Sequence, residues 1–177
     1  MQISPQHCRE EKGIQDIALF GTSQGAASVL IAASQDKTLA PVIAENSFAD
    51  IQSLISDSIY DGQSSAIPGW IAIPSATLTW YRNGGSDTPS PLEAADNIHQ
   101  AVFLMHSYAD KLIAAYHSQL IFKALNGPKQ QWYLDEASHS LLFNDNPELY
   151  KAKVISFLDE YFTVPRSLTS TLSGEFN

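Results

Sequence analysis

Short apolar runs alternate with longer amphipathic stretches along most of this chain. Four runs are brief and almost continuously apolar, which is typical of strands that are buried on both faces of a parallel sheet. They cover Ile17–Phe20, Pro41–Ala44, Ala101–His106 and Gln130–Leu134. The fourth run is the most polar of the set, which favours a place at the edge of the sheet.

Three further stretches have the residue spacing of helices. The first, 23–35, is rich in alanine and other small residues, which suits a helix packed closely on a sheet. The second, 114–125, is followed by an Asn-Gly-Pro sequence that ends helices, and the third, 147–162, starts with a proline after an asparagine. Apolar strands that alternate with helices predict an α/β fold, with a mostly parallel sheet of about four strands and helices on both faces.

The length of 177 residues fits one domain, which we place at 1–163. Within it, the segment 60–97 combines aromatic residues with many glycines and prolines, and this mixture predicts a cap-like insertion of short helices and loops over a cleft. The last residues, 164–177, are rich in serine and threonine without periodicity, so we expect a loose C-terminal tail.

Charge and composition narrow the function. The net charge of −9 argues against a nucleic-acid partner, which would require a basic face. A single cysteine, Cys8, excludes an internal disulfide, and the five histidines lack metal-binding spacing, so we expect neither a metal nor another cofactor. No apolar run reaches the roughly 18 residues of a membrane span, and no signal peptide is visible, so we expect a cytoplasmic protein.

The most informative motif is Gly-Thr-Ser-Gln-Gly at 21–25, a G-x-S-x-G sequence. An apolar strand ends directly before it and a small-residue helix follows it, which is the setting of a nucleophile elbow. Gly21 and Gly25 would let the backbone turn sharply and project the hydroxyl of Ser23 above the sheet. The start of the helix would add partial positive charge beside this hydroxyl.

A serine nucleophile needs a histidine base, and the base needs a third group that orients it. Asp110 follows the third predicted strand and His139 follows the fourth, which gives the chain order serine, acid, histidine. Because the carboxyl ends of parallel strands meet at one edge of a sheet, we expect Ser23, Asp110 and His139 to lie together there.

Other candidates for the site have weaker support. Asp50 follows the second strand and is an alternative acid. His106, at the end of the third strand, either forms local hydrogen bonds or shapes the site. The remaining histidines, His7, His99 and His117, are expected on the surface.

Residues 15–161 resemble the C-terminal half of α/β-hydrolases of the broad dienelactone hydrolase, prolyl oligopeptidase and Bem46-like group. The resemblance is carried by the elbow motif and by three later segments: Ser90–Ala95 before the third strand, Asp110–Ile113 and Ala137–Ser140. It implies a partial α/β-hydrolase fold whose N-terminal strands are missing, and a small-molecule acyl substrate.

The resemblance also assigns roles. It implies Ser23 as the nucleophile, His139 as the general base and acid, Asp110 as the residue that orients His139, and the backbone N–H of Gln24 as one donor of the oxyanion hole. The predicted activity is therefore hydrolysis of an ester, thioester or amide bond through an acyl-enzyme.

Three positions depart from the family pattern. Ser107 and Ser138 stand where glycines are usual, and Ala114 stands where a proline is usual. Each exchange replaces a special backbone residue by an ordinary one, so we expect looser loops near the site. Misplacement of about 1 Å can cost roughly 100-fold in rate.

The family's first half would supply a second oxyanion donor and neighbours for the strand Ile17–Phe20. Without them this strand is an unpaired apolar edge, so we expect a truncated product, or a chain completed by a homo-oligomer or by a partner chain that covers the edge. The alternative function is accordingly an inactive hydrolase-fold module that acts by binding or self-association.

Overall fold

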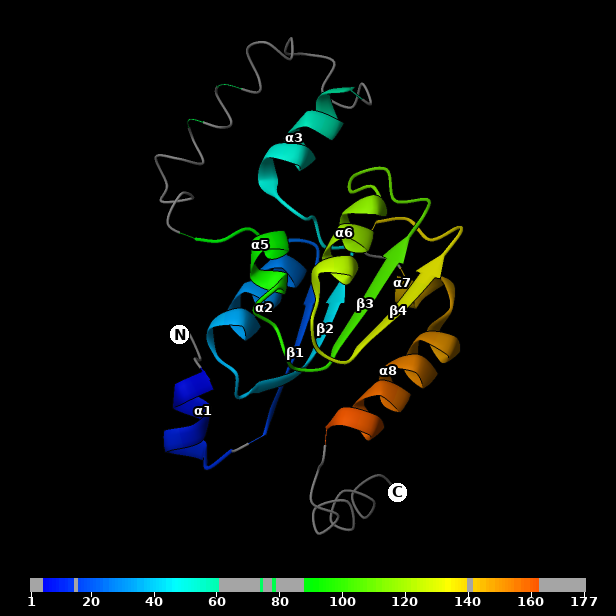
Figure 1. Ribbon diagram of the computed structural model, residues 1–177. Helices are drawn as coiled ribbons and strands as arrows, with labels where there is room; N and C mark the ends of the chain where they lie inside the picture. Colours follow the sequence, from blue (N-terminus) through cyan, green and yellow to red (C-terminus); the bar gives the residue numbers. More distant parts are fainter. Residues whose placement is uncertain are drawn as a thin grey trace.

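In the computed structural model, which describes residues 5–14, 16–60, 74, 78, 88–139 and 142–162, four parallel strands form one sheet (Figure 1). The strands pair in the order in which they follow one another along the chain. This confirms the predicted α/β class and the four-stranded parallel sheet. The strands are β1 (Ile17–Thr22), β2 (Leu39–Glu45), β3 (Val102–Ser107) and β4 (Lys129–Leu134).

The strands β1, β2 and β4 cover their predicted apolar runs and extend beyond them, whereas β3 begins and ends one residue later than predicted. The extensions include polar residues at the carboxyl ends: Thr22 pairs with Glu45, and Ser107 pairs with Leu134. Backbone pairing does not require an apolar side chain, so a strand can continue past the end of its apolar run. The polar residues at these ends begin the edge that carries the candidate site.

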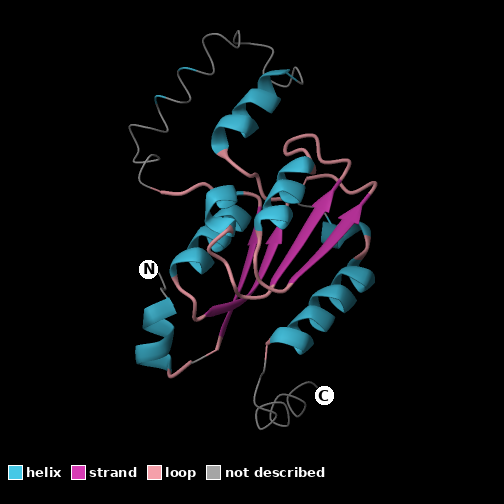
Figure 2. Cartoon of the chain, viewed as in Figure 1, coloured by secondary structure: helices cyan, strands magenta, loops and turns pink. Residues whose placement is uncertain are grey.

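Helices cover both faces of the sheet, as predicted (Figure 2). The three predicted helices are α2 (Gln24–Gln35), α6 (Tyr116–Ala124) and α8 (Pro147–Tyr161). Four further helices in the described residues were not assigned bounds from the sequence, and all four are ten or fewer residues in length. They are α1 (Pro5–Lys12), α3 (Ile51–Tyr60), α5 (Pro91–Ala95) and α7 (Leu142–Asp145).

Two apolar cores lie on the two faces of the sheet. On one face, small residues of α2 allow the helix to pack closely on β1 and β2, beside α5 and α6. This core contains Ala26, Leu30, Ala33, Val42, Ala44, Ile98, Leu104 and Ile121. On the other face, α7 and α8 pack on the same strands, and this core contains Ile43, Phe103, Met105, Leu142, Tyr150 and Phe157.

The strand β1 forms one edge of the sheet, with β2 as its neighbour. Its Leu19 packs against the core beneath α2, whereas the side chain of Phe20 points to the opposite face and is 54% exposed. The expected apolar edge is therefore present in the described residues.

Most of the predicted cap-like segment 60–97 lies outside the described residues, as does the predicted tail 164–177. Within the segment 60–97, the structure describes residue 60 at the end of α3, the single positions 74 and 78, and residues 88–97. None of the helices in the described parts of the chain combines the length and apolar character needed to cross a membrane.

Candidate active site

Ser23 occupies the tight turn between β1 and α2, at the carboxyl edge of the sheet. Its backbone has φ 57° and ψ −120°, a conformation that residues with a side chain rarely adopt. Two hydrogen bonds hold the turn: the N–H of Ser23 donates to the carbonyl of Glu45 (2.8 Å), and the N–H of Ala27 donates to the carbonyl of Ser23 (3.2 Å). The strained turn projects the hydroxyl away from the helix, to which it gives no capping bond.

The two glycines of the motif differ in role. A side chain on Gly21 would overlap the backbone of Gly25 and Ala26, because the end of β1 and the first turn of α2 approach closely there. No described atom lies within 4 Å of the corresponding position on Gly25. The expectation that both glycines are needed for the turn is therefore wrong for Gly25, because the unusual backbone angles fall on Ser23 itself.

The three predicted triad residues lie in one chain of hydrogen bonds. The hydroxyl of Ser23 lies 3.0 Å from Nε2 of His139, and Nδ1 of His139 lies 2.6 Å from Oδ2 of Asp110. In the tautomer that satisfies both contacts, Nδ1–H donates to the carboxylate and Nε2 accepts from the serine. The side chains come from loops after β1, β3 and β4, so the strand order brings them to one edge.

Asp110 is almost completely buried, with 7% of its surface exposed, and its carboxylate accepts four hydrogen bonds. The backbone N–H groups of Leu112 and Ile113 donate to Oδ1, at 2.8 and 3.0 Å. Oδ2 accepts from His139 and from the side-chain amide of Asn46, which lies at 2.5 Å. A buried carboxylate with this many donors remains compatible with negative charge.

His106 lies directly behind the acid and is fully buried. Its Nε2–H donates to the carbonyl of Ile113 (2.8 Å), and its Nδ1 accepts from the hydroxyl of Ser118 (2.6 Å). Burial lowers the pKa of His106, and the Ile113 carbonyl and Asp110 oppose that effect. The expectation of local hydrogen bonds is confirmed, and one of them reaches the segment Asp110–Ile113.

Sequence reasoning missed two buried polar residues at the end of β2. Glu45 is 3% exposed and accepts a hydrogen bond from the hydroxyl of Tyr150 (2.8 Å). Burial raises the pKa of Glu45, whereas the Tyr150 bond and the nearby His139 lower it. The second residue, Asn46, contacts Asp110 as described above. The signal was available, because a Glu-Asn pair directly follows an apolar strand at the same edge of the sheet.

Asp50 does not take the part of the alternative acid. Its carboxylate accepts hydrogen bonds from the backbone N–H and the hydroxyl of Ser53, both at 2.7 Å, at the start of α3. This arrangement is typical of an aspartate that caps a helix.

The surface location expected for His117 is wrong. This side chain is fully buried, because α6 turns it toward the loop after β2. Its Nδ1 accepts from the N–H of Ala49 and its Nε2–H donates to Asp57 on α3, both at 3.1 Å. Burial lowers the pKa of His117, and Asp57 opposes this. His99 is exposed as expected, and the side chain of His7 lies outside the described residues.

One departure from the family pattern strengthens the site rather than loosening it. The hydroxyl of Ser107 donates to the carbonyl of Leu134 (3.3 Å) and accepts from the N–H of Ala109 (3.1 Å). These bonds link the ends of β3 and β4, so the expected loosening is wrong at this position. Ser138 is exposed and Ala114 is partly buried.

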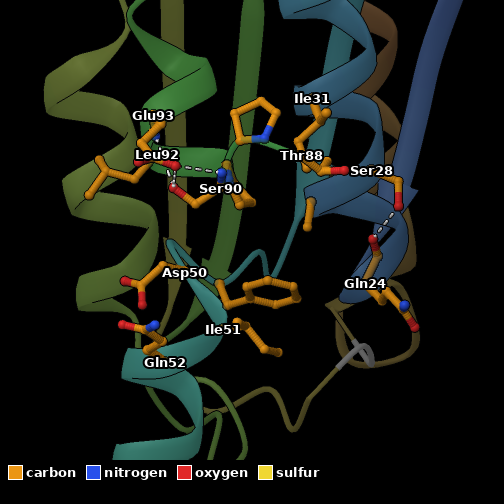
Figure 3. A pocket seen from close by; sticks show the side chains of 14 residues that line it. Gln24, Ser28, Ile31, Asp50, Ile51, Gln52, Thr88, Ser90, Leu92 and Glu93 are labelled. Atoms are coloured by element: carbon orange, nitrogen blue, oxygen red, sulfur yellow. Dashed lines mark hydrogen bonds between the residues drawn. The ribbon is translucent and has the colours of Figure 1, made fainter. Parts of the chain in front are cut away.

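A cleft of about 780 Å³ begins at Gln24, and none of Ser23, Asp110 and His139 is among the residues that line it (Figure 3). Its walls are one side of α2, the loop after β2 and the segment that leads into α5. None of the described residues that line it is basic, and two are acidic. The lining includes Gln24, Ser28, Ile31, Phe48, Asp50 and Glu93.

Gln24 is also the first residue of α2, so its backbone N–H has no acceptor within the helix. This position agrees with the predicted role of that N–H as an oxyanion donor.

The strand order, the elbow and the chain order of the site residues define a member of the α/β-hydrolase superfamily. The profile of the prolyl oligopeptidase family matches residues 10–164. The chain therefore belongs to the prolyl oligopeptidase family. No curated protein matches the sequence at a significant level.

Solved structures show the same fold at low sequence identity. An esterase of Pyrococcus furiosus aligns with a TM-score of 0.66 and 18% identity over 89% of this chain and 59% of the esterase. An acylaminoacyl peptidase of Pyrococcus horikoshii gives 0.64 and 20%, over 88% of this chain and 26% of the peptidase. Acetyl xylan esterase 1 of Thermoanaerobacterium sp. gives 0.61 and 14%, over 84% and 46%. The chain thus spans less than two thirds of these relatives.

Proposed function

We propose that this chain is a serine hydrolase that cleaves an ester, thioester or amide bond of a small-molecule acyl substrate through an acyl-enzyme. The observation that carries the proposal is the unbroken hydrogen-bond chain from Ser23 through His139 to Asp110, at 3.0 and 2.6 Å. The arrangement has the geometry that an activated serine nucleophile requires. In the proposal the protein is cytoplasmic, and residues 1–163 form one domain with a cap over 60–97.

The geometry supports a two-step reaction. His139 accepts the proton of Ser23 as the serine oxygen attacks the substrate carbonyl carbon, and the Gln24 N–H donates to the oxygen that becomes negative. His139 then protonates the leaving group as its bond to carbon breaks, which leaves an acyl-serine. Water attacks this ester with His139 again as the base. The bond between the acyl carbon and the serine oxygen then breaks, His139 returns the proton to Ser23, and the acid product leaves. Asp110 holds the imidazole tautomer throughout.

Related proteins support the bond types in the proposal. Two of the three similar structures are esterases and one is an acylaminoacyl peptidase, so both ester and amide cleavage occur on this fold. The cleft beside Gln24 offers space for a substrate of small or medium size.

Labelling of the purified chain with a fluorophosphonate probe tests the proposal. We expect wild-type labelling that Ser23→Ala and His139→Ala abolish. Ser34→Ala is the matched control, because Ser34 lies near the far end of α2, does not line the cleft, and donates its hydroxyl only to the carbonyl of Ile31 in the same helix. A folded wild-type chain that takes up no probe would contradict the proposal.

One observation favours the second candidate, a module that acts by binding or self-association. The edge strand β1 presents an exposed Phe20 and pairs on one side only among the described strands. An apolar strand edge of this kind recruits another strand from a second copy or a partner. A monodisperse monomer of 19.4 kDa in analytical ultracentrifugation would exclude the self-association form of this candidate.

A further inference from the structure

Asn46 directly follows β2 and is completely buried. Its backbone is fixed between the two central strands, because its N–H donates to the carbonyl of Met105 (2.8 Å). From this position the side-chain amide Nδ2–H donates to Oδ2 of Asp110 at 2.5 Å. Its other polar atom, Oδ1, has no hydrogen-bond partner among the described residues. All the hydrogen bonding of this amide within the described residues is therefore directed at the acid.

The oxygen that Asn46 contacts is the one that His139 uses. Oδ2 of Asp110 accepts from Nδ1 of His139 at 2.6 Å, whereas Oδ1 is held by backbone N–H groups. The backbone donors therefore fix one carboxylate oxygen, and Asn46 fixes the other. A donor on Oδ2 also places partial positive charge beside the imidazole, which disfavours the protonated ring.

We propose that Asn46 is a positioning residue that orients Asp110 and limits how strongly Asp110 favours the protonated form of His139. The inference rests on the proposed function, since it assigns a role within the same Ser23–His139–Asp110 arrangement. It adds a residue that the sequence motifs do not contain.

A purely structural reason for asparagine at this position must be separated from this role. The backbone of Asn46 has φ 52°, and asparagine tolerates such left-handed angles better than most residues. Glycine tolerates them as well, so Asn46→Gly preserves the backbone and removes only the amide. If the backbone were the only reason for Asn46, this variant would behave as the wild type.

The direction of the expected effect follows from the charges around His139. Removal of the Asn46 amide leaves the negative charge of Asp110 less compensated, so the imidazolium form of His139 becomes more stable. The other titratable groups that interact with this imidazole, Glu45 at the end of β2 and His106 in β3, are unchanged in the variant. The base then becomes free only at a higher pH.

The first experiment measures the rate of fluorophosphonate labelling of the 177-residue chain between pH 5 and 9. For Asn46→Gly we expect labelling about tenfold slower at pH 7, since a hydrogen bond to a charged group is lost. We expect half-maximal labelling to move up by about half a pH unit or more. Gln100→Ala is the matched control, because its amide donates to the carbonyls of Ala33, Asp36 and Leu39, away from the site. It removes buried amide bonds without a change of the pH profile.

A second measurement decides the inference independently of activity. NMR titration of ¹³C-labelled histidine, with the His139 signal assigned by its loss in His139→Gln, reports protonation of the ring directly. We expect the His139 midpoint to rise in Asn46→Gly. Asn46→Ala also removes the amide donor, at the expense of a left-handed backbone that alanine tolerates less well. It should raise the midpoint as well, and it serves if the glycine variant does not fold.

The outcomes separate the two proposals. If the wild type takes up no probe but the NMR titration midpoint of His139 rises in the variants, the proposed function is overturned and the role of Asn46 stands. If the wild type is labelled but the NMR titration midpoint of His139 is unchanged in both variants, the role of Asn46 is overturned and the proposed function stands.

Discussion

The carbonyl oxygen of Gly25 would overlap a Cβ atom placed on Gly21. Neither backbone can move, because one belongs to β1 and the other to the first turn of α2. We therefore expect Gly21→Ala to lower the free energy of unfolding by about 3 kcal/mol, measured by urea denaturation. Gly25→Ala is the natural comparison: it has room and lies within a helix, so it should be neutral or stabilising by up to about 1 kcal/mol. Equal losses in both variants would contradict this account of the elbow.

A second prediction concerns the pH dependence of stability and follows from the hydrogen bond between Tyr150 and Glu45. Burial raises the pKa of Glu45, so the folded state favours its protonated form, and stability falls as pH rises through that value. Tyr150→Phe removes the hydroxyl that stabilises the ionised form, and should cost about 1–2 kcal/mol at pH 7. The cost should shrink toward pH 4.5, where the carboxyl is protonated.

Glu45→Gln removes the titration and keeps the shape of the side chain. We expect this variant to be at least as stable as the wild type at pH 7, and the difference to narrow as the pH is lowered. Urea denaturation over pH 4.5–7 measures both effects. A Tyr150→Phe cost that is constant with pH would show that the hydroxyl does not act through the charge of Glu45.

The burial of His117 leads to a prediction of how the free energy of unfolding changes at acidic pH. Burial lowers the pKa of His117 below the ordinary value of 6.5, so the ring is neutral in the fold and takes up a proton on unfolding. The stability from this group is complete above pH 6.5 and is lost as pH falls through the lowered value. His117→Gln should lower the free energy of unfolding by about 1–2 kcal/mol at pH 7, because hydrogen bonds are lost. Between pH 7 and 5, the free energy of unfolding should fall less in this variant than in the wild type. His99→Gln, at an exposed position, should follow the wild-type curve.

The exposed edge of the sheet makes a prediction about association. Phe20 is 54% exposed, so Phe20→Ser should cost less than about 1 kcal/mol within one copy of the chain. If the edge of β1 recruits a second copy, the substitution should weaken self-association, as measured by sedimentation velocity. Ile155→Ser on α8 removes an equally exposed apolar side chain, at 55%, and should leave association unchanged. The same weakening in both variants would indicate nonspecific contacts instead.

The apolar runs predicted the sheet well because the central strands β2 and β3 are buried and the edge strands β1 and β4 are mostly half-buried. Local spacing also revealed α2, α6 and α8, each of which has an apolar stripe against the sheet. The other helices were missed for a physical reason. α5, for example, spans five residues and is held by a capping box between Ser90 and Glu93, so it has no long periodic pattern to detect.

The residues of the candidate site show what sequence-based prediction could and could not find. Ser23, Asp110 and His139 could be found because each stands just after a predicted strand, and parallel strands bring such positions together. Asn46 stands in the same kind of place, but its partner lies 64 residues further along the chain. Which buried polar residue contacts which is decided by the loops between strands, and no local pattern encodes that choice.

The agreement between strand order and chain order affects how the site is assembled. Each strand after β1 pairs with the strand before it, so the described sheet can grow in one direction as the chain emerges during synthesis. The hydroxyl of Ser23 and the imidazole of His139 are separated by 116 residues, and their contact closes only after β4 is added. Contacts this distant in sequence form late in folding. The bond between them is therefore a marker of complete folding: a population in which Ser23 meets His139 has already built every strand between them.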